Sequence, residues 1–200
     1  MPNNLRELGL PPTIQNMEAD AAYRATILPV TIERDSSRPA EGRVTLLAEC
    51  GIGRVALPLT NRHFLAALAV AVPVWIAIGL GVAGPVYLPA GLNAWLAFVL
   101  WQPLLEELVF RGLLQGQLLR ILPGSRVGPV SVANLIASAA FAAMHLFSQP
   151  PAWALAVVAP SLIFGHLRER FDSVWPAVAM HALYNSGFGL AALSVARAPA

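Results

Sequence analysis

The sequence contains no lysine, only one cysteine and few charges of either sign. Charged residues make up 12% of the 200 residues and hydrophobic ones 56%, whereas soluble domains have about 25% and 45–50%. This balance argues against a soluble globular protein. The 13 basic residues are all arginines and form no basic run, so we expect no nucleic-acid partner. The lone Cys50 cannot form an intramolecular disulfide, and no Cys/His cluster has zinc-finger spacing.

An N-terminal apolar run is also missing. Residues 1–20 carry Glu7, Glu18 and Asp20 and have no continuous apolar stretch, whereas a cleaved signal peptide has an apolar region of about 7–15 residues. We therefore expect no cleaved signal peptide, and we expect membrane insertion to begin at the first internal apolar segment.

Long stretches without charge dominate the rest of the chain. Residues 64–105, 127–165 and 173–196 contain no Asp, Glu, Lys or Arg, and about 20 apolar residues suffice to cross a bilayer. Gly/Pro clusters at 83–91 and 149–151 divide the two longer stretches. Because the stretches are continuously apolar rather than alternating, helices are favoured over a barrel. The sequence predicts an all-α polytopic membrane protein with five transmembrane helices near residues 64–82, 92–118, 128–147, 152–167 and 174–194.

Arginine placement predicts the orientation of these helices, because cytoplasmic loops retain positive charge. Arginines precede the first predicted helix and lie in the loops after the second and the fourth: Arg54, Arg62, Arg120, Arg126, Arg168 and Arg170. The loops at 83–91 and 148–151 carry no charge, which is typical of the outer face. We therefore expect a cytoplasmic N-terminus and an exterior C-terminus.

Residues 1–62 differ in composition and hold 14 of the 24 charged residues. Two stretches rich in apolar and β-branched residues, 27–33 and 43–47, flank a turn-like Ser-Ser-Arg-Pro cluster. A small strand pair and a mostly flexible lead both fit this pattern. We therefore divide the chain into an N-terminal cytoplasmic region, residues 1–62, and a membrane domain, residues 63–200.

Ionisable residues occur inside the predicted spans, where each costs about 2.5–3.5 kcal/mol on insertion scales and therefore needs a reason. Glu107 and Arg111 are four residues apart on one helix face, so we expect them to form a structural ion pair. Glu106 points about 100° away from Glu107 and has no cation three or four residues along the helix. Glu106 is therefore the free carboxylate.

Histidines occur at patterned positions on two further helices. His181 and Asn185 are four residues apart and present a ring nitrogen and an amide on one face, while Phe141 lies one turn before His145 and can pack against its ring. One carboxylate, two imidazoles and one amide between helices are the groups needed to activate water and to stabilise an oxyanion. The expected chemistry is hydrolysis of an acyl bond and, in a membrane, of a peptide bond.

These motifs resemble those of the CAAX protease and bacteriocin-processing family, the glutamic-type intramembrane endopeptidases that include the type II CAAX prenyl endopeptidases. The family pattern is Glu-Glu-x-x-x-Arg, Phe-x-x-x-His and His-x-x-x-Asn on successive membrane helices. All three motifs are intact and in order here. The resemblance covers about residues 92–194 and leaves residues 1–62 unexplained.

The resemblance implies a base role for Glu106 with His145 and an oxyanion-side role for His181 and Asn185. A glutamate base makes a metal unnecessary, so we expect no metal and no other cofactor. The residues that would support this site are Glu107, Arg111 and Phe141. The eukaryotic prenyl endopeptidases typically have eight spans, whereas short bacterial members often cleave C-terminal sorting signals or process bacteriocins. We therefore expect a bacterial plasma-membrane hydrolase whose substrate is a membrane-associated peptide or protein.

Two alternatives remain open at this point. A catalytically idle relative would act as a membrane partner or immunity factor, with the motif residues serving packing. A proton-coupled transporter would use Glu106 and the membrane histidines as a relay, although five spans without a repeat do not favour transport. The sequence names neither the substrate nor the oligomeric state.

Overall fold

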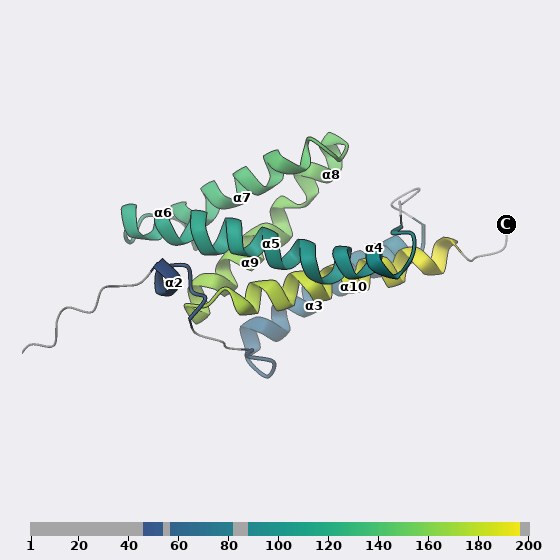
Figure 1. The fold of residues 1–200 in the computed structure, drawn as a ribbon, viewed down its shortest axis with the longest axis horizontal. Coiled ribbons are helices and arrows are strands. Elements are labelled where there is room, and N and C mark those ends of the chain that lie inside the picture. The colour runs from purple at the N-terminus through teal and green to yellow at the C-terminus, as the bar shows by residue number, and fades with distance from the viewer. Residues whose placement is uncertain (1–45, 54–56, 82–87, 197–200) are drawn as a thin grey trace, which may run out of the picture. The chain divides into compact units, whose positions relative to one another are not determined.

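A computed structural model describes residues 46–53, 57–81 and 88–196 of the chain (Figure 1). The described residues are mostly helical, which confirms the expected all-α class. The strand pair considered for the N-terminal region falls on residues 27–47, and only the last two of these are described. These two begin the short helix α2 (Leu46–Glu49); residues 1–45 lie outside the described part.

Helices overlap each of the five ranges predicted to cross the membrane. They are α3 (Arg62–Gly79), a continuous helix over residues 92–121, α7 (Val132–His145), α8 (Pro151–Ala156) followed by α9 (Val158–Phe171), and α10 (Trp175–Ala196). Among the described residues, only α3 is both long and apolar enough to qualify as a membrane span, and α7 is a shorter apolar helix. The count of five spans therefore stays a prediction.

The helix over residues 92–121 changes its hydrogen-bond register along its length. It consists of α4 (Leu92–Leu96), the π-helix η2 (Ala97–Trp101), α5 (Gln102–Glu107), the π-helix η3 (Leu108–Gln115) and α6 (Gly116–Ile121). In a π-helix each N–H donates to the carbonyl five residues earlier, and such turns are frequent at functional sites. The two glutamates end α5, between the two π-helices. This helix packs against α7 on one side and α10 on the other (Figure 1).

A short hairpin connects α6 to α7. Strand β1 (Arg126–Val127) pairs antiparallel with β2 (Val130–Ser131), and Gly128 adopts a positive φ of 59° in the turn. The Ser131 hydroxyl then accepts a hydrogen bond from the Asn134 N–H and caps α7. The helix consequently begins four residues later than the apolar pattern predicts.

Helix α10 lies against α3 and α9, and their shared core consists of Phe64, Ala67, Phe164, Leu167, Ala177 and Met180. Two glycines allow large rings to approach the α10 backbone. A Cβ atom on Gly187 would lie 2.2 Å from Trp75 Cε2, and one on Gly189 would lie 2.4 Å from Trp95 Cζ3. These contacts hold α3 and α4 close to the helix that carries His181.

Residues 46–53, which we call the docking segment, contact the ends of three helices. Arg168 Nη2 donates to the Glu49 carbonyl at 2.7 Å, and Trp175 Nε1 donates to the Ile52 carbonyl at 3.0 Å. A Cβ atom on Gly116 would lie 2.7 Å from the Glu49 carbonyl oxygen, so only glycine fits there. Side-chain hydrogen bonds hold the pKa of the Glu49 carboxyl below its usual range; the bond from Gln117 has the larger effect and the bond from Arg120 the smaller one.

Candidate active site

Glu107 and Arg111 form the ion pair that their spacing predicts. Arg111 Nε lies 3.2 Å from Glu107 Oε2, and both side chains are fully buried. The guanidinium also reaches α9, where Nη2 donates to the Ser161 hydroxyl at 2.6 Å and to the Ser161 carbonyl at 3.1 Å. A buried charge needs such compensation, because an unpaired one is strongly destabilising. The pair therefore fixes α5 and η3 against α9.

His181 joins this pair from α10. Its Nδ1 lies 2.9 Å from Glu107 Oε1, and its Nε2 lies 3.8 Å from Glu106 Oε2. The Phe164 ring stacks on the imidazole, with the two ring centroids 4.8 Å apart. Because a carboxylate can only accept, Nδ1 carries the proton of the shorter contact. The orientation of the ring is thus set by Glu107 and Phe164.

Glu106 differs from its neighbour in both exposure and partners. Its side chain is 23% exposed, whereas that of Glu107 is 0% exposed. Both oxygens of Glu107 are occupied, by Arg111 and by His181. Among the described residues, no group donates a hydrogen bond to Glu106 within 3.5 Å, and its one ion-pair contact within 4.0 Å is His181 Nε2, which is charged only when His181 is protonated. Glu106 is therefore the carboxylate available to a water molecule or substrate.

His145 lies at the C-terminal end of α7 and is held by its own helix. Its Nδ1 lies 2.9 Å from the Phe141 carbonyl oxygen, and the Phe141 and His145 rings are 4.5 Å apart. A carbonyl accepts, so Nδ1 carries the proton and neutral His145 keeps a lone pair on Nε2. Both His145 and His181 are near enough to Glu106 to interact electrostatically with its charge.

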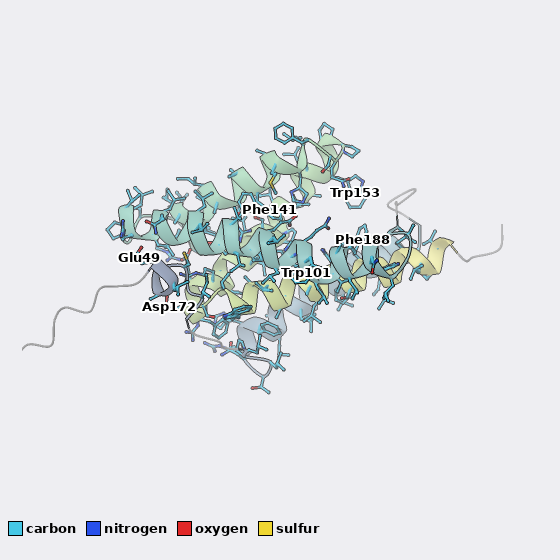
Figure 2. All side chains as sticks on the ribbon, viewed as in Figure 1. Glu49, Trp101, Phe141, Trp153, Asp172 and Phe188 are labelled. Carbon is cyan, nitrogen blue, oxygen red and sulfur yellow. The ribbon has the colours of Figure 1, made fainter. Side chains whose placement is uncertain are left out.

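Phe141 contributes more than the support of one histidine. Its ring lies between α7 and the helix that carries the glutamates (Figure 2). It contacts the Phe110 ring edge-on at 5.2 Å and the His181 ring at 6.0 Å, and Arg111 lies 5.4 Å from its centroid. Phe141 thus connects the two imidazoles with the buried guanidinium.

Asn185 is the predicted site residue whose partner was not anticipated. Its Nδ2 donates to the Phe98 carbonyl of η2 at 2.8 Å. Within the described part of the chain it makes no hydrogen bond to Glu106, His145 or His181. The structure therefore brings Glu106, Glu107, Arg111 and His181 together, holds His145 through Phe141, and ties Asn185 to the backbone of η2.

Three residues of this site were missed by the sequence analysis: Ser161, Phe164 and Phe98. Ser161 and Phe164 lie one turn apart on α9, and a serine in an apolar helix is a signal for a hydrogen bond between helices. The Phe98 carbonyl has no signature in a side-chain pattern. A second buried polar contact lies one turn beyond Arg111, where Gln115 Nε2 donates to the Gly165 carbonyl and to Glu169 Oε1.

The buried contacts leave few groups with metal-binding geometry. No group of three or more His, Cys, Asp or Glu side chains in the described residues is arranged to hold a metal ion. Glu107 and the Nδ1 atoms of both histidines are already engaged. The chemistry that the arrangement supports is acid–base chemistry: one accessible carboxylate, one imidazole lone pair and one imidazole nitrogen facing the carboxylate.

The site residues lie within a stretch that matches a known protein family. A scan against models of protein families matches residues 88–187 to the type II CAAX prenyl endopeptidase Rce1-like family. Comparisons with curated proteins and with solved structures found no match. The family consists of proteases, which are hydrolases, and it implies an integral membrane protein. Because the match covers half of the chain and contains all three motifs, the chain belongs to the Rce1-like family of type II CAAX prenyl endopeptidases.

Proposed function

We propose that the protein is an intramembrane endopeptidase that hydrolyses a peptide bond of a membrane-associated protein or peptide with water activated by Glu106. The observation that carries this proposal is the difference between the two adjacent glutamates. Glu107 is fully buried and has both oxygens engaged, whereas Glu106 is partly exposed and accepts no hydrogen bond from the described residues. A general base must be free to take a proton from water.

The first step is the activation of water. Glu106 accepts a proton from a water molecule while the water oxygen attacks the carbonyl carbon of the scissile bond. His145 Nε2 carries a lone pair because Nδ1 donates to the Phe141 carbonyl, so it accepts the second hydrogen of the same water and orients it. Positioning of this kind is what a carboxylate–imidazole pair contributes to hydrolysis.

The next requirement is a donor for the oxyanion that forms on the substrate. Nδ1 of His181 already donates to Glu107, so Nε2 is a donor only in the imidazolium form. When His181 is protonated, its positive charge and that of Arg111 balance the two negative charges of Glu106 and Glu107, and the cluster has no net charge. The second N–H of the Asn185 amide supplies a further donor, since the first is bound to the Phe98 carbonyl. Protonated Glu106 then gives its proton to the leaving amine as the C–N bond breaks.

The family and the arginine pattern support a proposal for the cellular setting. We propose a bacterial plasma-membrane protein with a cytoplasmic N-terminus, which processes C-terminal sorting signals, bacteriocin precursors or prenylated C-termini. We also propose that the reaction needs no metal. The arrangement of base and donors supports this, because one carboxylate, two imidazoles and one amide already cover water activation and oxyanion stabilisation.

The proposal is tested with purified full-length protein in nanodiscs and a library of membrane-proximal peptides, read by mass spectrometry. We expect cleavage by the unmodified protein, no cleavage by Glu106→Gln, and unchanged cleavage after treatment with a strong chelator. Loss of activity on chelation that zinc alone restores would contradict the metal-free mechanism.

An idle membrane partner is the second candidate to be separated by this experiment. It predicts no cleavage of any peptide, and normal function in cells for a folded Glu106→Gln variant. A transporter predicts substrate or proton flux in sealed vesicles without any cleaved product. Family membership favours the protease over both.

A further inference from the structure

One backbone carbonyl beside the site, that of Phe98, does not accept a hydrogen bond from its usual helical donor. In an α-helix the Phe98 carbonyl would accept from the N–H of Gln102, four residues later. In η2 that N–H instead donates to the Ala97 carbonyl, five residues earlier. The Phe98 carbonyl therefore needs a donor from another position.

The next residue along the helix cannot donate a hydrogen bond to this carbonyl either. If the π register continued, the Phe98 carbonyl would accept from residue 103. That residue is Pro103, which has no backbone N–H, and it is buried at the start of α5. The register change and the proline together remove both helical donors of this carbonyl.

The side chain of Asn185 supplies the missing donor from α10. Its Nδ2 lies 2.8 Å from the Phe98 carbonyl oxygen. Because a carbonyl only accepts, this contact also fixes which end of the amide faces η2. Oδ1 and the second N–H are then presented in one defined orientation.

We propose that Pro103 is a positioning residue of this enzyme: by leaving the Phe98 carbonyl without a helical donor, it reserves that carbonyl for Asn185 and so fixes the amide for the reaction. This inference rests on the proposed function. Pro103 lies one turn before Glu106, and Asn185 lies one turn after His181. The contact thus joins the two helices that carry the base and the oxyanion donors.

The test is the Pro103→Ala substitution, which restores an N–H at this position. We expect the new N–H to compete for the Phe98 carbonyl and to release Asn185. A single hydrogen bond contributes about 0.5–1.5 kcal/mol, so kcat should fall roughly 2- to 13-fold while KM stays within error. Pro73→Ala is the matched control, because Pro73 is an exposed proline inside α3; its kcat should be unchanged.

A double-variant cycle separates positioning from a general effect on the fold. If Pro103 acts through Asn185, adding Pro103→Ala to Asn185→Ala should cause no further loss of kcat in single-turnover measurements. An equal loss in both backgrounds would overturn the proposal, and so would a Pro103→Ala variant with unchanged kcat.

A conservative replacement provides the rescue. The α-hydroxy acid analogue of alanine at position 103 also lacks an N–H, so we expect its kcat to remain near that of the unmodified protein. If Pro103→Ala fails to fold, this variant decides alone, and a loss of kcat would overturn the inference. The unmodified protein and Glu106→Gln are assayed alongside. Failure of the proposed function is then recognised separately, as absence of any cleavage by the unmodified protein.

Discussion

His181 Nδ1 lies 2.9 Å from Glu107 Oε1, so the carboxylate that neutralises Arg111 also orients the imidazole on α10. The sequence separation of these two residues is 74 positions. Glu107 is thus the structural partner of Arg111 on its own helix and of His181 on α10. The contact also leaves Glu106 as the accessible member of the glutamate pair, and the predictions below use this difference.

The Glu106→Gln variant should fold normally and be inactive. The amide has nearly the volume of the carboxyl but cannot accept a proton from water, and the ion-pair contact that Glu106 would lose, with His181 at 3.8 Å, is long and involves a carboxylate that is 23% exposed. Thermal unfolding and single-turnover cleavage of the purified variant check this outcome. A folded variant that still cleaves peptide would remove Glu106 as the base.

Glu107→Gln should behave differently, because it leaves the Arg111 guanidinium buried without its counter-charge. Breaking a buried pair from one side costs about 3–5 kcal/mol, so the unfolding temperature or the yield should fall. His181 also loses its carboxylate acceptor, so the activity per folded molecule should fall as well. Thermal unfolding and single-turnover cleavage check both effects. A fully stable but inactive Glu107→Gln variant would indicate that Glu107 is the base.

His181→Ala should lower kcat more than it weakens substrate binding. A donor aimed at charge that develops in the transition state is typically worth about 10²–10³ in rate. Steady-state kinetics with a cleaved peptide would show a reduced kcat at a similar KM. An effect confined to KM would reassign His181 to the binding of substrate.

Gly187→Ala should destabilise the fold through the contact of α10 with α3. The added Cβ would lie 2.2 Å from Trp75 Cε2, and overpacking of this kind typically costs about 1–3 kcal/mol. Gly79→Ala is the control, since its Cβ would have no neighbour closer than 3.5 Å. Thermal unfolding of the two variants in the same detergent makes the comparison, and equal stabilities would contradict the close packing described here.

The predicted topology places Arg126 in the cytoplasm and Gln149 outside. Reporter fusions after each residue should give a cytoplasmic signal at the first and an exterior signal at the second, because arginine-bearing loops stay in the cytoplasm. The reverse pattern at either position would require a different number of spans.

The part of the site that could be predicted from sequence is the part that lies on single helices. Glu107 with Arg111, and Phe141 with His145, are pairs four residues apart, and both contacts are present. The glycine and proline clusters also separated the helices near their observed ends. Local periodicity contains this information, because helix geometry alone fixes which residues are neighbours.

The contacts that join helices could not be predicted in this way. His181 reaches Glu107 and Asn185 reaches Phe98 only because α10 packs on α5 and η2 in one particular register. The structure places Pro103 at the junction of η2 with α5. No pattern of side chains in a single sequence indicates a π-helix or the carbonyl that it leaves unpaired.

The docking segment has a consequence for the extent of the folding unit. The family match begins at residue 88, yet two helices inside it, α9 and α10, donate hydrogen bonds to acceptors that precede it. Arg168 and Trp175 donate to the Glu49 and Ile52 carbonyls, and the Tyr184 hydroxyl donates to the Ala67 carbonyl at 2.6 Å. A protein trimmed to residues 88–187 would lose these three acceptors and the contact of the Glu49 backbone with Gly116. We therefore expect a protein limited to residues 88–187 to be less stable than one that also contains the docking segment and α3.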